Sequence, residues 1–233
     1  MAYEPKELKF VATPEKGEVS ALLIRPADAS HLLVLGHGAS SNMRTPLLAT
    51  IAEHLANARI ATFRYNFPYS ENKRGRDANP ICIATVRSAV AAAREAAPDL
   101  PLIAGGHSFS GRMTSTAASE APLQRVKGIV FFSFPLHPPG KPGTERADHL
   151  FKVNVPMLFL TGTRDEFATG DLLPSVVAKL GEQATLHLLD TADHSLKVLK
   201  RSRESKEDVF AEASRVVRDW AESLDQQDES TRA

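Results

Sequence analysis

The stretch LIAGGHSFSGRMT, residues 102–114, joins an apolar run to a helix-compatible segment through a glycine pair. Ser108 stands in the turn between them, which is the strand–turn–helix context that a nucleophile elbow requires. Such an elbow holds its serine in a strained backbone conformation, so the residues two before and two after it must be small. Gly106 and Ser110 meet this condition, although the usual pattern has glycine at the second position. The alternative is a glycine loop packed under a helix. The two interpretations differ in whether the rest of the chain supplies Ser108 with a base, an acid and oxyanion donors.

Short apolar runs alternate with longer helix-like segments on both sides of this stretch. This alternation is typical of an α/β fold, a mostly parallel, doubly wound sheet with helices on both faces. An antiparallel hairpin is expected at the N-terminus, with its turn at residues 14–17. We predict a single domain over residues 1–224 and a disordered tail over 225–233. The strands are expected at 31–36, 59–65, 101–105, 127–134, 155–162 and 184–190, and helices near 45, 79, 109, 171 and 209.

Composition excludes several classes of protein. The 233 residues are 42% apolar and 24% charged, and 28 basic residues balance 28 acidic ones. No net charge therefore attracts nucleic acid or anionic lipid, and neither partner is expected. The single Cys82 allows no internal disulfide and no paired-cysteine metal site. No apolar run resembles a signal peptide or a membrane span, so we predict a cytoplasmic protein.

A nucleophilic serine needs a base, and in this fold the chain order is nucleophile, acid, base. His187 lies inside the last predicted strand, which fixes it away from the strand end. His194 lies in the polar segment DTADHSLK just past that strand. Because ligands collect at the carboxyl ends of parallel strands, His194 is the expected base for Ser108.

The expected acid is Asp165, which follows the strand at 155–162 by a short turn. A carboxylate there would accept the second imidazole N–H and fix the tautomer. Glu166 is the nearest rival, and Asp190 and Asp193 are weaker because they share the segment of the base. A purely structural role for Asp165 as a helix cap is the alternative.

Two backbone N–H groups are candidates for an oxyanion hole. Phe109 opens the helix after Ser108, where its N–H has no helical partner. The segment LGHGAS at 35–40 follows another strand, and Ala39 is the expected second donor.

The runs GHGASSNMRTPLL, GGHSFSGRM, VPMLFLTGTRDEF and DTADHSLK together resemble the α/β-hydrolases. More narrowly, the chain resembles small lidless predicted hydrolases related to dienelactone hydrolase, a group that includes eukaryotic testis-expressed proteins. The resemblance implies a triad of Ser108, Asp165 and His194, with Ala39 and Phe109 at the oxyanion hole. Dienelactone hydrolases use a cysteine nucleophile, and Cys82 is far from the elbow, so their specific reaction is not implied.

The predicted function is hydrolysis of small esters, or of related thioesters or amides, through an acyl-enzyme on Ser108. No metal or organic cofactor is expected. About twenty residues separate two of the predicted strands, from 134 to 155, which leaves no room for a cap domain. One alternative is a hydrolase-like scaffold that binds without catalysis. Another is an NADP-binding oxidoreductase, because residues 36–41 read G-x-G-x-x-S and Arg64 ends the next strand.

Two groups of basic residues have open roles. Lys73, Arg74 and Arg76 lie in the loop at 66–79, which should overhang the same sheet edge. They form either a solvated charged loop or a contact for anionic substrates. Arg112 lies in the first turn after the elbow, where a cation opposes the helix dipole. It is expected to pair with an acid, and a contact with a substrate carboxylate is the alternative.

Overall fold

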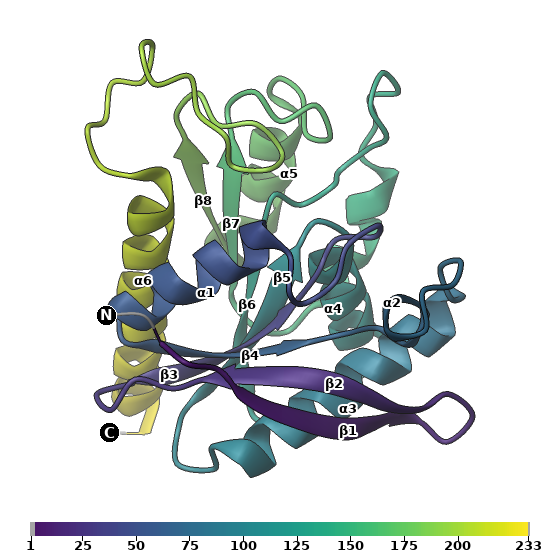
Figure 1. The fold of residues 1–233 in the computed structure, drawn as a ribbon. Coiled ribbons are helices and arrows are strands. Elements are labelled where there is room, and N and C mark those ends of the chain that lie inside the picture. Colours follow the sequence, from purple (N-terminus) through teal and green to yellow (C-terminus); the bar gives the residue numbers. More distant parts are fainter. Residues whose placement is uncertain (1–2, 233) are drawn as a thin grey trace.

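The computed structural model describes residues 3–232 and contains one eight-stranded sheet. The strands lie in the order β1-β2-β4-β3-β5-β6-β7-β8 (Figure 1). β1 and β2 form the expected antiparallel hairpin, β2 is antiparallel to β4, and all later neighbours are parallel. The predicted fold class is therefore confirmed. The bounds are β1 (Lys6–Thr13), β2 (Gly17–Ile24), β3 (His31–Gly36), β4 (Ile60–Tyr65), β5 (Leu102–His107), β6 (Val126–Phe132), β7 (Met157–Gly162) and β8 (Ala184–Leu189).

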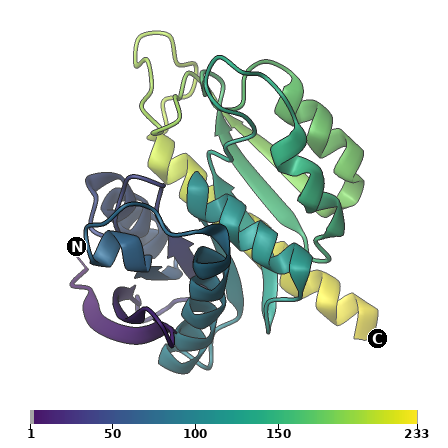
Figure 2. The same ribbon diagram turned by 90° about the vertical axis from the view of Figure 1, so that its right-hand side faces the viewer.

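Helices cover both faces of the sheet, as Figure 2 shows from the side of α3 and α4. α1 and α6 bury their apolar side chains on one face, and α3, α4 and α5 bury theirs on the other. Every residue of β3, β4, β5 and β7 is buried, and apolar residues or glycine make up most of these strands, as expected for a parallel sheet covered on both faces. The bounds are α1 (Pro46–Asn57), α2 (Pro68–Glu71), α3 (Asn79–Ala96), α4 (Phe109–Glu120), α5 (Leu172–Leu180) and α6 (Val209–Arg232), with 3-10 helices η1 (Glu145–Lys152) and η2 (Gly181–Gln183).

Two segments expected to be loops contain short helices. α2 is a single turn that begins at Pro68, and η1 lies between β6 and β7. Neither is long enough to repeat an apolar pattern, so periodicity did not reveal them. The β6–β7 connection holds η1 and no further domain, in line with the predicted lack of a cap.

The C-terminal end of the chain extends α6. Its backbone is helical to Arg232, over a stretch where the sequence predicts a disordered tail at 225–233, while Ala233 lies outside the described residues. Polar residues such as those of DQQDE continue a helix readily once a packed apolar face has nucleated it. Disorder of this tail in solution stays a prediction. None of the described helices is both long and apolar enough to cross a membrane.

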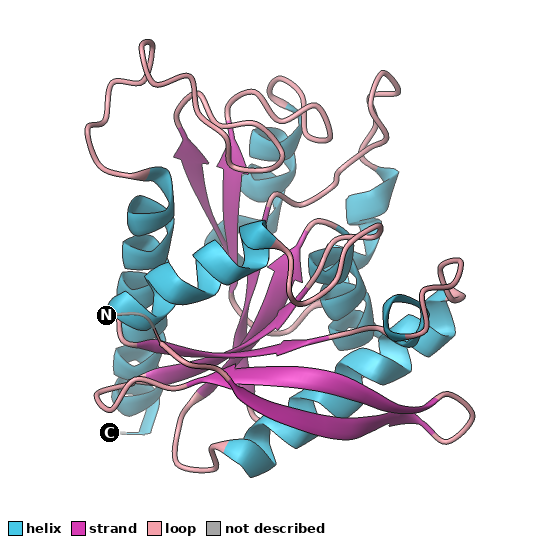
Figure 3. Cartoon of the chain, viewed as in Figure 1, coloured by secondary structure: helices cyan, strands magenta, loops and turns pink. Residues whose placement is uncertain are grey.

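The parallel strands end at one edge, where long loops gather (Figure 3). Three of these loops matter for the site. They follow β3, β7 and β8, and they meet the turn between β5 and α4.

Candidate active site

Ser108 lies in a sharp turn between the last residue of β5 and the first residue of α4. Its backbone has φ 54° and ψ −113°, a conformation that non-glycine residues rarely adopt. Such a conformation costs of the order of 1–3 kcal/mol and persists only where the surroundings enforce it. The Ser108 N–H donates to the carbonyl of Phe132 at the end of β6, 2.9 Å away, which ties the turn to the sheet edge.

Two glycines make room for this turn. A Cβ at Gly106 would lie 2.1 Å from Ser110 Oγ, and one at Gly36 would lie 2.4 Å from Ser110 Cβ. Ser110 itself is fully buried, and its hydroxyl donates to the carbonyl of His107 at 3.1 Å. The serine in the usual glycine position is thus accommodated because its two neighbours have no side chains. Gly36 therefore serves the packing of Ser110.

The structure brings together Ser108, His194 and Asp165 from three separate loops. His194 Nε2 lies 2.9 Å from Ser108 Oγ, and His194 Nδ1 lies 2.9 Å from both carboxylate oxygens of Asp165. Asp165 has a fully buried side chain and also accepts the N–H of Phe167 at 2.8 Å. Because Nδ1 faces a carboxylate, it carries the proton, and Nε2 presents its lone pair to the serine hydroxyl.

The rival residues are engaged elsewhere. His187 lies in β8 with its Nε2 2.8 Å from Glu212 Oε1. Glu166 is exposed to solvent. Asp193 accepts the N–H groups of two residues in its own turn, and Asp190 accepts the N–H of Glu204.

Arg64, which the oxidoreductase alternative would place on a nucleotide phosphate, is buried. It is 3% exposed and donates to the carbonyl of Met43 at 3.1 Å. Its guanidinium therefore holds the loop after β3, and its burial argues against the nucleotide-binding role of the oxidoreductase alternative.

The two N–H groups expected at the oxyanion hole belong to different elements. Phe109 is the first residue of α4, and Ala39 lies in the loop after β3. Within residues 3–232, neither N–H donates a hydrogen bond to the protein. Both therefore remain available for an oxygen that develops negative charge.

Comparison with known proteins places the chain in a family. Residues 29–222 match the family described as an alpha/beta hydrolase domain. The chain belongs to the alpha/beta hydrolases. This family match does not test the narrower resemblance to the testis-expressed group.

Several solved structures share this fold. Dienelactone hydrolase from Anabaena variabilis is 18% identical, with a TM-score of 0.69 over 94% of this chain and 97% of that one. The esterase domain of a Rhodothermus marinus protein is 18% identical, with a TM-score of 0.68 over 94% and 98%. XC6422 from Xanthomonas campestris, a serine hydrolase without a lid, is 19% identical, with a TM-score of 0.65 over 83% and 87%.

Two further residues of this alpha/beta hydrolase hold the candidate base in place. His107, directly before Ser108, donates its Nε2–H to the carbonyl of His194 at 2.9 Å. The ring of Phe167 lies 4.1 Å from the ring of His194, centroid to centroid, at 31°. Sequence reasoning assigned a role to neither His107 nor Phe167, because no pattern in the chain marks these contacts.

Three histidines with lowered pKa values should make the stability of the hydrolase depend on pH. Burial lowers the pKa of His37, His107 and His149 from the ordinary 6.5 to about 4. Between about pH 4 and 6.5 the unfolded chain therefore binds more protons than the folded one. The free energy of unfolding should fall as the pH drops through this window, by up to about 1.4 kcal/mol per pH unit for each histidine.

Urea unfolding at pH 7.5, 6.5 and 5.5 measures this slope. His149 lies outside the candidate site, with its Nε2 2.7 Å from Ser115 Oγ. The variant His149→Asn should show a shallower slope, because one of the three groups is gone. An unchanged slope would contradict the prediction.

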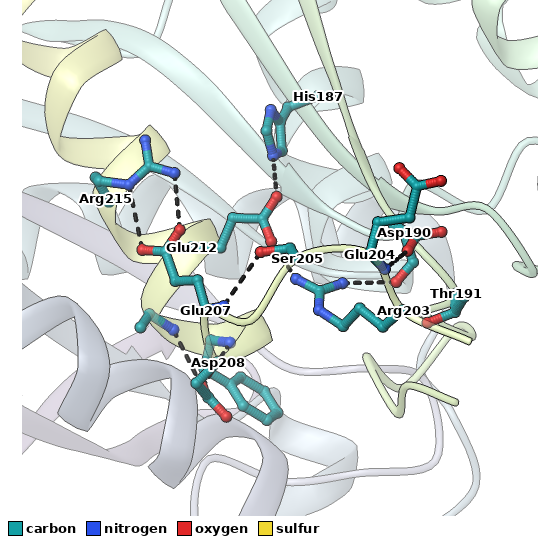
Figure 4. A network of polar contacts seen from close by, with 12 residues as sticks. His187, Asp190, Thr191, Arg203, Glu204, Ser205, Glu207, Asp208, Glu212 and Arg215 are labelled. Atoms are coloured by element: carbon teal, nitrogen blue, oxygen red, sulfur yellow. Dashed lines mark hydrogen bonds and ion pairs between the residues drawn. The ribbon is translucent and has the colours of Figure 1, made fainter. Parts of the chain in front are cut away.

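The loop that carries His194 is anchored at its far end by a polar network (Figure 4). Arg203 donates to the carbonyl of Asp190 at 2.6 Å and pairs with Glu212 of α6. Glu212 also contacts His187 of β8. The side chain of Arg203 is 4% exposed, so this ion pair is shielded from water.

Removing Arg203 should therefore destabilise the hydrolase. For Arg203→Met we expect a loss of about 3 kcal/mol in the free energy of unfolding, because Glu212 stays buried with only His187 as partner. Arg215→Met is the matched control, since Arg215 pairs with Glu207 in the same network but is 45% exposed. That control should lose less than about 1 kcal/mol. Equal losses in urea unfolding would show that the buried pair has no special role.

Proposed function

We propose that this alpha/beta hydrolase is a serine hydrolase that cleaves small esters through an acyl-enzyme on Ser108. The observation that carries the proposal is the 2.9 Å separation between Ser108 Oγ and His194 Nε2, with Asp165 on the other ring nitrogen. A base within hydrogen-bond reach of the hydroxyl, itself oriented by a carboxylate, is the arrangement that activates a serine.

The proposed reaction has two halves. Ser108 Oγ attacks the ester carbonyl while its proton passes to His194 Nε2, and the carbonyl oxygen becomes an oxyanion held by the N–H groups of Ala39 and Phe109. His194 then gives the proton to the leaving alcohol as the carbon–oxygen bond breaks. In the second half a water molecule gives a proton to His194 Nε2 and attacks the acyl carbon. The bond from that carbon to Ser108 Oγ then breaks, His194 returns the proton to Oγ, and the acid leaves. Asp165 stays ionised and stabilises the imidazolium.

The type of substrate follows from the surroundings of the site. The β6–β7 connection forms no cap, so the edge that carries Ser108 suits small or exposed esters better than long buried chains. The esterase and lidless serine hydrolase to which the chain is similar fit this interpretation. Thioesters and amides are related substrate classes that the same mechanism would also cleave.

The proposal also includes a cytoplasmic location and a closer relation of this hydrolase to the testis-expressed group.

A fluorophosphonate probe tests the proposal directly, because it reacts covalently with activated serines. We expect the native protein to be labelled, and the labelled peptide in mass spectrometry to be the one that contains Ser108. A series of p-nitrophenyl esters of increasing chain length should show turnover that favours the shorter chains. A protein that is neither labelled nor active on any ester would be the non-catalytic scaffold instead.

A further inference from the structure

Three arginines near the nucleophile lack an acidic partner. No ion pair within residues 3–232 includes Arg76, Arg112 or Arg146, and we call these three the arginine cluster. The expectation that Arg112 pairs with an acid is therefore wrong for the described residues. Asp77, the acid next to Arg76, pairs instead with Lys16 at 2.7 Å.

Two members of the cluster lie beside Phe109, the residue that follows Ser108. The guanidinium carbon of Arg76 is 5.1 Å from the centre of the Phe109 ring, and that of Arg112 is 5.9 Å from it. Arg112 is one turn along α4 from Ser108, and its N–H donates to the Ser108 carbonyl at 3.3 Å. This bond keeps the backbone of Arg112 next to the turn that holds Ser108.

The position is electrostatically unfavourable for a cation. Arg112 lies in the first turn of α4, where the helix dipole is positive. Burial lowers the pKa of Arg112, and the positive charges of Arg146 and Arg76 lower it further. Positive charges gathered in this way without an acid are relieved when an anion binds between them.

A cleft of about 610 Å³ lies beside Ala39, and Arg76 of the arginine cluster lines it. It begins at Ala39 and runs between the loop after β3 and the segment at 69–76. All of its ionic lining residues are basic, namely Lys73, Arg74 and Arg76.

We propose that the hydrolase selects esters whose acyl chain ends in a carboxylate, which the arginine cluster binds through Arg112 and Arg76. The inference rests on the proposed function. The leaving group must stay within reach of His194, which donates a proton to it, so the acyl chain is the part that extends over Phe109. Arginine binds carboxylates through two parallel hydrogen bonds, which gives this site both strength and direction.

Two esters of equal chain length test the proposal, p-nitrophenyl hexanoate and the mono-p-nitrophenyl ester of adipic acid. They differ in a terminal methyl against a terminal carboxylate. We expect kcat/KM for the adipate to exceed that for the hexanoate about tenfold, with spontaneous hydrolysis subtracted. Arg112→Gln should lower kcat/KM for the adipate about tenfold more than kcat/KM for the hexanoate, since only the adipate carries a carboxylate that accepts charge-assisted hydrogen bonds. Added salt should reduce the preference as well.

Arg94→Gln is the matched control, because Arg94 lies on α3, is partly exposed and contacts Gln124 rather than the arginine cluster. It should leave both rates unchanged. Equal rates for the two esters, or a loss of both rates alike in Arg112→Gln, would overturn the carboxylate proposal while hydrolysis by Ser108 stands. Absence of turnover for both esters together with absence of fluorophosphonate labelling would instead overturn the proposed function.

Discussion

Replacing Ser108 with alanine is expected to lower kcat for ester hydrolysis by about 10⁴- to 10⁶-fold. The reason is that Oγ is the atom His194 Nε2 contacts at 2.9 Å, and alanine leaves that base without a nucleophile to activate. The residual rate should come from substrate binding and from the N–H groups of Ala39 and Phe109, which the substitution retains. Steady-state kinetics with a short p-nitrophenyl ester measures the effect.

A second serine of α4 serves as control for Ser108→Ala. Ser119 lies at the far end of the helix, where its hydroxyl donates to the carbonyl of Thr116 at 2.8 Å. Ser119→Ala should keep kcat within about twofold, because surface changes remote from the chemistry are nearly neutral. The two variants should also separate in fluorophosphonate labelling, which only Ser108→Ala loses. A Ser108→Ala protein that is folded and still fully active would exclude an acyl-enzyme at this residue.

Asp165→Asn is expected to lower kcat by about 10⁴-fold with little change in KM. The Asp165 carboxylate accepts from both His194 Nδ1 and the N–H of Phe167. An asparagine can keep the second bond, but its amide would face the imidazole with a donor. His194 would then carry its proton on Nε2, the nitrogen that must take the proton of Ser108.

Glu166→Gln is the matched control, since it makes the same chemical change one residue later, on an exposed side chain. It should leave kcat and KM within about twofold. Circular dichroism and urea unfolding should show that Asp165→Asn is folded, because the substitution preserves shape. If Glu166→Gln were the inactive variant, the acid would have been assigned to the wrong carboxylate.

The sequence predicted the fold well because its strands are buried on both faces. Continuous apolar runs at β3, β5 and β7 mark a parallel sheet, and the helices between them carry clear starts at proline or after the glycine pair. Chain order and strand ends then limit which acid and which histidine can meet Ser108. That is why three residues far apart in the chain could be named before their distances were known.

The supporting contacts could not be predicted in the same way. Whether His107 reaches the carbonyl of His194, or Phe167 covers its ring, depends on loop conformations that no periodic pattern encodes. The same is true of Arg203, whose buried contact to Glu212 links a loop to a helix. Short elements such as α2 escape prediction because a single turn has too few residues to show a pattern.

The positive φ at Ser108 costs the folded state free energy, while the proposed chemistry needs a serine at this position. Glycine adopts that angle without strain, so selection for thermal tolerance alone would favour losing the hydroxyl there. A directed-evolution experiment that screens only for heat resistance would therefore select Ser108→Gly, a variant that is more stable and inactive.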